Sequence, residues 1–380
     1  MTSHVPSLRT GVRSRAITVA LGAGLVAIAP LRGAQAEHDM ESHQHSMKTV
    51  ERSGEHLSIE VDPDRKEIAI VIGPIDLPAG TTHHALEQLP VQEGTVPFDL
   101  TIRGYRAEIV DGEGRPVPQD VLHHMNLLDP DRRELFMPIM LRVLAASHET
   151  RPVSLPGWLF GIPMRGGARF LALAMLHNPT SETYTGVRVR LVIEYERRER
   201  LPLYTIIPWH LDTMFPVAGT KSFDLPPGAS SKSFEASPVV SGLILGLGGH
   251  LHQYATRLTL RDLTTDDILY DVEPDVNDDG HIEKIPMLLH RGKGPGLLVE
   301  PSHVYRVTAE YWNPTGELIP GGGMGAVAGA FVPLDEWPSA DPGNPLYVAD
   351  YEWVLASQEH HEAGMDARDP PPSRSGNRRR

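Results

Sequence analysis

Short runs of alternating apolar and polar residues, separated by glycine and proline, constrain the fold of this chain more than any other feature. "LSIEV", "FDLTIRGYRAEIVD" and "GVRVRLVIEYE" alternate in this way, and turn sequences such as "DGEG" at Asp111 to Gly114 bound such runs. A period of two places the apolar side chains on one face of a β-strand. The 34 prolines and 35 glycines interrupt helices and supply turns between short strands. We therefore predict an all-β protein with two tandem antiparallel β-sandwich (jelly-roll-like) domains.

The N-terminus has the three parts of a secretory signal peptide. Arg9, Arg13 and Arg15 come before the apolar run "AITVALGAGLVAIAPL", and "AQA" ending at Ala36 matches an A-x-A cleavage site. The apolar run is shorter than the ~20 residues that a spanning helix needs, so an uncleaved anchor fits less well. We expect cleavage near Ala36, export to the periplasm or the extracellular space, and no membrane span in the mature protein.

The length of the mature chain favours two domains rather than one core. The break "RRERLPLYTIIPW" is the expected boundary between them, and "RRELFMPIMLRVLAA" is the one stretch with a helix-like pattern. The leader after Ala36 is rich in histidine and methionine, which are suitable copper ligands. The predicted segments are a signal peptide at 1–36, a His/Met-rich disordered leader at 37–56, sandwiches at 57–203 and 204–336, and an extended, largely disordered tail at 337–380.

Composition excludes several kinds of site. The formal net charge of −14 argues against nucleic-acid binding. The chain has no cysteine, so a metal site must use histidine, methionine, aspartate or glutamate. No nucleophile elbow is present, and Ser-His-Asp catalysis therefore has no support. His210 lies near the expected domain boundary, and we interpret it as a hydrogen-bonded structural histidine.

Paired histidines are the candidate metal ligands. In a strand, residues i and i+2 share a face, so His250 and His252 can ligate together. His123 and His124 are adjacent, and they need a bulge or a strand end to point the same way. Two further pairs, in a loop and in the polar C-terminal region, are interpreted as surface histidines: His83/His84 and His360/His361.

An ordered series of motifs resembles one known family. The series runs over residues 100–335 and comprises "VLHHMNLLD", "RFLALAMLHNP", "TGVRVRLVIEY", "GGHLHQYATRLTLRD" and "VYRVTAEYWNPTGE". It is similar to the copper type II, ascorbate-dependent monooxygenases, the peptidylglycine and dopamine hydroxylases. The resemblance implies two tandem sandwiches, each with one copper, that face each other across a solvent-filled cleft.

The resemblance also implies ligands and chemistry. His123 and His124 would bind the first copper, and His250 and His252 the second. The implied reaction is hydroxylation of a C–H bond in a small-molecule or peptide substrate, with dioxygen and with ascorbate or another one-electron donor. A non-catalytic copper-binding or copper-handling protein on the same fold is the alternative, and enzymatic activity is left open. A metal-free β-sandwich that acts as an adhesin or binding module is the third hypothesis.

Two positions depart from the family pattern. At the first site Met175 replaces the family's third histidine, while His177 holds the histidine place of "HNP", and either could complete the site. At the second site the family's methionine aligns with Ala330. Met324 comes six residues earlier, about 20 Å along a strand. It could substitute only if the loop at 321–325 folds back.

One further motif matches half of a calcium-binding loop. In "DVNDDGHIE", Asp275, Asn277, Asp279 and Gly280 stand at the first offsets of such a loop. The twelfth position is Pro286 rather than a bidentate glutamate. We therefore interpret this segment as a polar turn between two strands.

Overall fold

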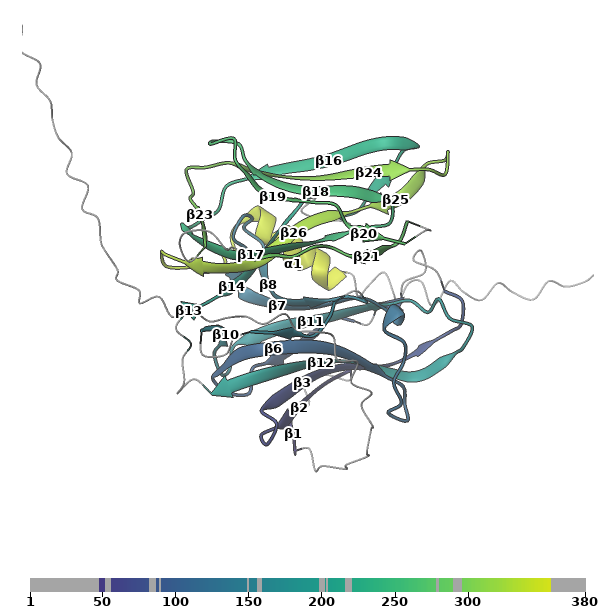
Figure 1. Cartoon of the computed structure of the whole chain (residues 1–380). Helices are drawn as coiled ribbons and strands as arrows, with labels where there is room; N and C mark the ends of the chain where they lie inside the picture. The colour runs from purple at the N-terminus through teal and green to yellow at the C-terminus, as the bar shows by residue number, and fades with distance from the viewer. Residues whose placement is uncertain are drawn as a thin grey trace, which may run out of the picture. The chain divides into compact units, whose positions relative to one another are not determined.

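A computed structural model describes residues 48–51, 56–81, 87–88, 90–148, 150–155, 159–197, 202, 204–215, 221–277, 280–289 and 296–356. This part of the chain is built almost entirely from antiparallel strands, which confirms the all-β, β-sandwich class. Figure 1 shows the strands stacked in layers. The expected signal peptide, His83/His84 and His360/His361 lie outside the described residues.

The first sandwich consists of an eight-stranded and a five-stranded sheet. The larger sheet has the order β1-β2-β3-β12-β6-β10-β13, with β9 beside β6: β1 Lys48–Glu51, β2 Leu57–Asp62, β3 Glu67–Leu77, β12 Tyr184–Arg197, β6 Leu100–Val110, β10 Phe160–Met164, β13 Tyr204–Thr205 and β9 Val153–Ser154. The smaller sheet has the order β4-β11-β7-β8, with β5 beside β11: β4 Glu87–Gln88, β11 Arg169–Leu176, β7 Leu122–Arg133, β8 Met140–Ala146 and β5 Gln92–Thr95. A 3-10 turn, η1 Gln119–Val121, leads into β7.

Alternation in the sequence sets the core of this sandwich. In β2, Leu57, Ile59 and Val61 are buried while the residues between them are only partly covered. These side chains pack in one cluster with residues of the opposing sheet, including Phe170 and Leu127. The period-two pattern therefore places the apolar faces of the two sheets together, as the sequence predicts.

The second sandwich is built in the same way. One sheet has the order β14-β26-β17-β22, with β23 beside β17: β14 Ile207–Asp212, β26 Gly325–Pro333, β17 Gly242–Leu251, β22 Leu288–Leu289 and β23 Leu297–Val299. The other has the order β16-β24-β18-β19: β16 Gly228–Ala236, β24 Tyr305–Asn313, β18 Ala255–Asp262 and β19 Ile268–Val272. Two small two-stranded sheets complete it, β15 Phe223–Leu225 with β25 Ile319–Gly323 and β20 Asp275–Val276 with β21 Ile282–Lys284.

A wedge from the first sandwich enters the core of the second. It is the connection between β7 and β8, and its residues Leu135 and Phe136 are 0% and 5% exposed within the second core. The Phe136 ring lies 5.3 Å from that of Trp209. Trp337 packs against both cores, and its indole N–H donates to the carbonyl of Arg133 at 3.0 Å. The two sandwiches are therefore joined by buried apolar contacts.

Three segments differ from the expectations. The helix expected in "RRELFMPIMLRVLAA" is wrong: this segment is the end of β7, the wedge and β8. The α-helix of the described chain is α1 Pro345–Ala356, inside the tail that was expected to be extended, where Tyr347 and Val354 pack against β7, β8 and β11. The expected disordered leader contains β1, which pairs with β2. Among the described residues, no helix has the length and apolarity to cross a membrane.

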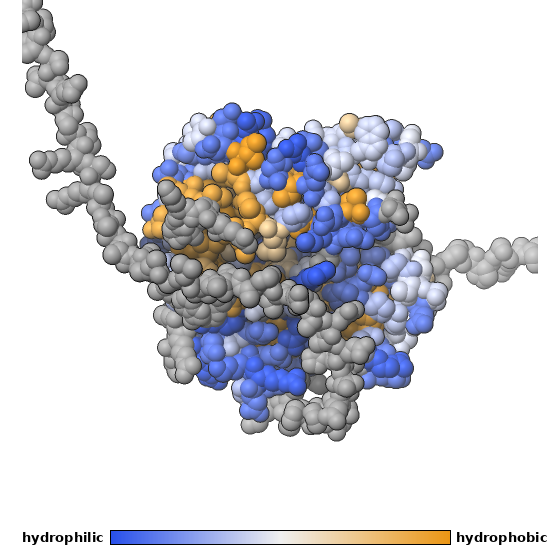
Figure 2. Space-filling view, viewed as in Figure 1, coloured by the Kyte–Doolittle hydropathy of each residue, from blue (hydrophilic) through white to orange (hydrophobic). Residues whose placement is uncertain are grey.

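An apolar edge lies on the second sandwich. Leu288 and Leu289 of β22 and Leu298 of β23 are exposed next to β17. Figure 2 shows an orange area over this sandwich, in the region where Figure 1 labels β23 and β17. These strands pair with the strand that carries His250, so the apolar edge borders the sheet of the candidate site.

Candidate metal centre

A β-bulge in β7 presents His123 and His124 to the second sandwich. In the register with β11, Met175 lies opposite His124 and Leu176 opposite Leu122, so His123 is an extra residue on β7. Neighbours in a regular strand point to opposite faces, whereas an extra residue re-aims the side chains. The two rings lie 4.2 Å apart between centroids. The bulge thus allows the adjacent histidines His123 and His124 to point the same way.

His177 joins the first-sandwich group directly after β11. Its side chain is buried, and its backbone N–H donates to the carbonyl of Val121 at 3.0 Å. Its ring lies 6.0 Å from that of His123, edge to face. Met175 lies directly opposite His124 in the sheet, and opposed residues of neighbouring strands share a face. Both candidates for the third ligand therefore stay close to the pair.

His250 and His252 lie where the chain crosses from one sheet to the other. β17 ends at Leu251, and β18 begins at Ala255 in the opposing sheet. Between them Tyr254 has a φ of 69°, in the left-handed region that suits a turn. The two histidine rings lie 5.2 Å apart. The run that alternates continuously in the sequence is thus two strands, with the histidine pair at the corner.

Met324 is a neighbour of His252, which corrects the expectation from the sequence. Leu251, at the end of β17, pairs with Gly325, at the start of β26. The residues just beyond this pair, His252 and Met324, therefore adjoin each other. The N–H of His252 donates to the carbonyl of Met324 at 3.4 Å. Ala330, the aligned methionine position, pairs with Gly246, earlier in β17 and away from His252. Antiparallel pairing brings Met324 to His252, and the expected need for a folded-back loop is wrong.

The hydroxyl of Tyr311 ties His252 to Met324. It accepts hydrogen bonds from the N–H of His252 at 3.2 Å and from the N–H of Met324 at 3.1 Å, and it donates to the Met324 carbonyl. Burial raises the pKa of Tyr311 to about 12, and the two N–H groups oppose that rise only in part. The hydroxyl therefore keeps its proton at neutral pH. Sequence reasoning missed Tyr311, because in the sequence it is an ordinary strand tyrosine.

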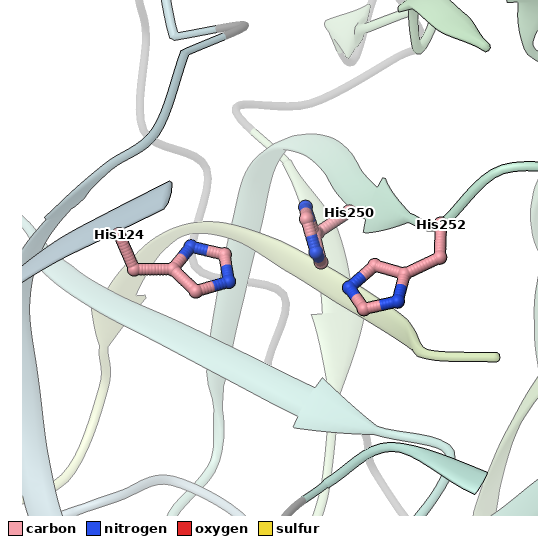
Figure 3. Close-up of side chains that lie close together, drawn as sticks. All are labelled: His124, His250 and His252. Carbon is pink, nitrogen blue, oxygen red and sulfur yellow. The ribbon is translucent and has the colours of Figure 1, made fainter. Parts of the chain in front are cut away.

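The histidines of the two sandwiches come together. The ring of His124 lies 5.2 Å from that of His250, and the ring of His123 lies 6.4 Å from that of His252. One nitrogen each of His124, His250 and His252 lie within 4.8 Å of one another, and Figure 3 shows these three rings gathered in one place. The resemblance implied two groups separated by a cleft, whereas here the groups are in contact.

The donors fit a copper ion. Metal–imidazole bonds of ~2.0–2.1 Å allow two nitrogens on one ion to lie at most about 4.2 Å apart. The nitrogens of the three rings lie within 4.8 Å, so small side-chain rotations bring all of them into bonding range. Imidazole binds copper and zinc, and copper(II) is the tightest of the divalent first-row ions; a thioether such as that of Met324 favours copper(I).

A cluster of buried charges at the same junction is structural. The carboxylate of Glu134, in the wedge, is fully buried and lies 3.1 Å from Nδ1 of His210. Nε2 of His210 lies 3.4 Å from Asp212, which also bonds Lys221. Burial by itself would raise the pKa of Asp212, but Lys221 and His210 hold that pKa well below its usual range. Both ring nitrogens of His210 face partners, which confirms that it is a hydrogen-bonded structural histidine.

The candidate calcium loop is a β-hairpin. β20 and β21 pair on either side of it, with Asp275 opposite Lys284. The side chain of Asn277 accepts a hydrogen bond from the N–H of His281 at 2.9 Å, as a turn residue does. The interpretation as a polar turn between two strands is confirmed.

Comparison with known proteins leaves the copper-monooxygenase resemblance resting on the sequence motifs. No family model and no curated protein matches this chain. Among solved structures, it is similar to the major capsid protein P2 from bacteriophage PM2, at 8% identity and a TM-score of 0.34, over 70% of this chain and 99% of that chain. Sulfolobus Turreted Icosahedral Virus matches at 9% identity and a TM-score of 0.31, over 77% and 98%. Likenesses this weak carry no functional argument.

Proposed function

We propose that this chain is an exported copper-binding protein whose centre is the histidine group at the junction of the two sandwiches. The observation that carries the proposal is the approach of His124, His250 and His252 to within 4.8 Å, measured between one nitrogen of each ring. Three imidazoles in that space, beside the methionine that adjoins His252, form a ligand set suited to copper in both oxidation states. The His/Met-rich leader supplies further ligands of the same kind.

The inherited chemistry is hydroxylation of a C–H bond in a small-molecule or peptide substrate. Copper held here would supply one-electron redox chemistry with dioxygen, with ascorbate or another one-electron donor. The chain's own residues fix the geometry: the bulge orients His123 and His124, and Tyr311 holds the backbone of His252 against that of Met324. The third ligand of the first-sandwich group is His177 or Met175.

A non-catalytic copper-handling protein is the second candidate. The five rings pack edge to face or tilted at 4.2 to 6.4 Å between centroids. Imidazoles grouped in this way hold copper whether or not a reaction follows, and the His/Met-rich leader and the alanine at the aligned methionine position, Ala330, favour copper handling over catalysis.

Copper titration of the mature protein, beginning at Glu37, tests the proposal. We expect copper to bind with micromolar or tighter affinity, measured by competition with a chelating dye and by metal analysis after gel filtration. His303→Ala is the matched control, because His303 bonds Asp262 instead of joining the histidine group. Failure of the wild type to bind copper refutes both candidates.

Oxygen consumption separates the two candidates once copper is bound. A hydroxylase consumes dioxygen in proportion to product when ascorbate and a substrate are added. A copper-handling protein keeps its copper and shows no substrate-dependent oxygen consumption. Mass spectrometry of the secreted protein tests export, with an N-terminus at Glu37 as the expected result.

A further inference from the structure

We propose that His124, His250 and His252 hold one metal ion in common, so that the centre is a single site with ligands from both sandwiches. The inference rests on the proposed copper-binding function and goes beyond it, because copper binding also allows one independent ion in each sandwich. A shared ion requires both sandwiches, because each supplies part of the ligand set. Neither sandwich has the complete site.

Distances between the rings support one ion over two. His250 lies as close to His124 of the other sandwich as to His252 of its own, at 5.2 Å between centroids in both cases. The first-sandwich pair, His123 and His124, is closer at 4.2 Å, but His250 is no closer to its own partner than to His124. Here the three rings form one group, with a nitrogen of each within 4.8 Å of the others. An ion bound to His250 and His252 therefore lies within reach of His124.

His123 and His177 flank this group. The ring of His123 lies 4.2 Å from that of His124 and 6.0 Å from that of His177. Among the described side chains, the nitrogens that lie within 4.8 Å of one another belong to His124, His250 and His252. His124 is therefore the first-sandwich histidine in that group. His124 is consequently the first-sandwich residue whose loss distinguishes a shared ion from two separate ions.

Contacts away from the histidines keep the shared geometry in place. The wedge buries Leu135 and Phe136 in the second core, and Trp337 packs against both cores. β7 begins beside His123 and His124 and ends at the wedge, so one strand carries both the ligands and the anchor. The ligands from the two sandwiches are thus brought together by folding rather than by the ion. Because coupling is reciprocal, an ion bound here stabilises the docked sandwiches.

Copper(II) titration of four proteins tests the shared site: the wild type, His124→Ala, His250→Ala and the double variant. If one ion is shared, His124→Ala and His250→Ala each lose the same single copper equivalent. In each variant, copper binding at that site weakens by about 100-fold or more, which exceeds the ~10–100-fold typical of residues outside the ligand set. The double variant loses no further equivalent. His303→Ala again serves as the control and retains the wild-type stoichiometry and affinity.

Separate ions give additive losses. If His124→Ala leaves an equivalent that His250→Ala removes, and the double variant loses two, the shared site is overturned while the proposed function stands. Absence of copper from the wild type overturns the proposed function and the shared site together. Circular dichroism checks the fold of each variant, and His124→Gln and His250→Gln replace any alanine variant that does not fold. The same non-additive result is expected from the glutamine pair.

Discussion

Phe136→Ala is the substitution that tests how the sandwiches are joined. The side chain is 5% exposed in the second core, 5.3 Å from the ring of Trp209 and 6.0 Å from that of Tyr305. Truncation of a buried phenylalanine costs about 3–5 kcal/mol. The two aromatic pairs account for about 1–3 kcal/mol of that loss, at about 0.5–1.5 kcal/mol each. The wedge is also tied to the second sandwich through its backbone, where Val239 N–H donates to the carbonyl of Leu135 at 2.8 Å.

The assay is urea unfolding with tryptophan fluorescence, together with copper titration of the folded variants. Phe136→Ala is expected to lower both the free energy of unfolding and the copper affinity, because the wedge fixes β7 and with it His124. Phe98→Ala is the matched control: its ring packs on Tyr195 at 5.2 Å within the first sandwich, away from the junction. That variant is expected to lose stability and to retain copper affinity. A Phe136→Ala protein that loses less than about 1 kcal/mol, well short of a core truncation, refutes the account of the wedge. Unchanged copper affinity, at a measured loss of stability, refutes its link to the site.

Three further predictions follow from the site and the buried charges. Asp212→Asn is expected to cost about 3–5 kcal/mol at pH 7, because it leaves Lys221 without its buried partner. The folded pKa of Asp212 lies below its usual value of 3.8. The contribution of this carboxylate to the free energy of unfolding is therefore present above pH 3.8 and is lost as the pH falls through the folded pKa. The urea midpoints of the variant and the wild type should converge in acid. Tyr311→Phe is expected to weaken copper binding by ~10–100-fold with the fold intact. Tyr270→Phe loses a hydrogen bond elsewhere and is expected to leave copper binding unchanged. Equal effects in both variants contradict the role of the Tyr311 hydroxyl in holding His252 beside Met324. Met324→Leu is expected to weaken copper(I) binding more than copper(II) binding, since thioethers select copper(I), and equal losses of the two affinities exclude the thioether as a ligand.

The sequence was sufficient for the features that depend on near neighbours. The fold class follows from alternation and turn residues, because the faces of a strand are set residue by residue. His250 and His252 could be paired for the same reason. The helix expected in "RRELFMPIMLRVLAA" does not form, because the segment contains Pro138 and spans the wedge. The apolar residues of the wedge pack in the core of the other sandwich instead of along one face of a helix. α1 was missed because its apolar residues contact strands far away in the sequence.

Tertiary structure decided which ligands can meet. The sequence determined an all-β chain with two candidate histidine pairs, and it identified His177, Met175 and Met324 as the other candidates. The bulge at His123, the pairing that brings Met324 to His252 and the contact of His124 with His250 all depend on registers between distant strands. A register is set by the packing of whole faces, and a shift of one residue reverses every side chain. Local sequence fixes which residues can ligate, whereas only the packed sandwiches fix which of them share a site.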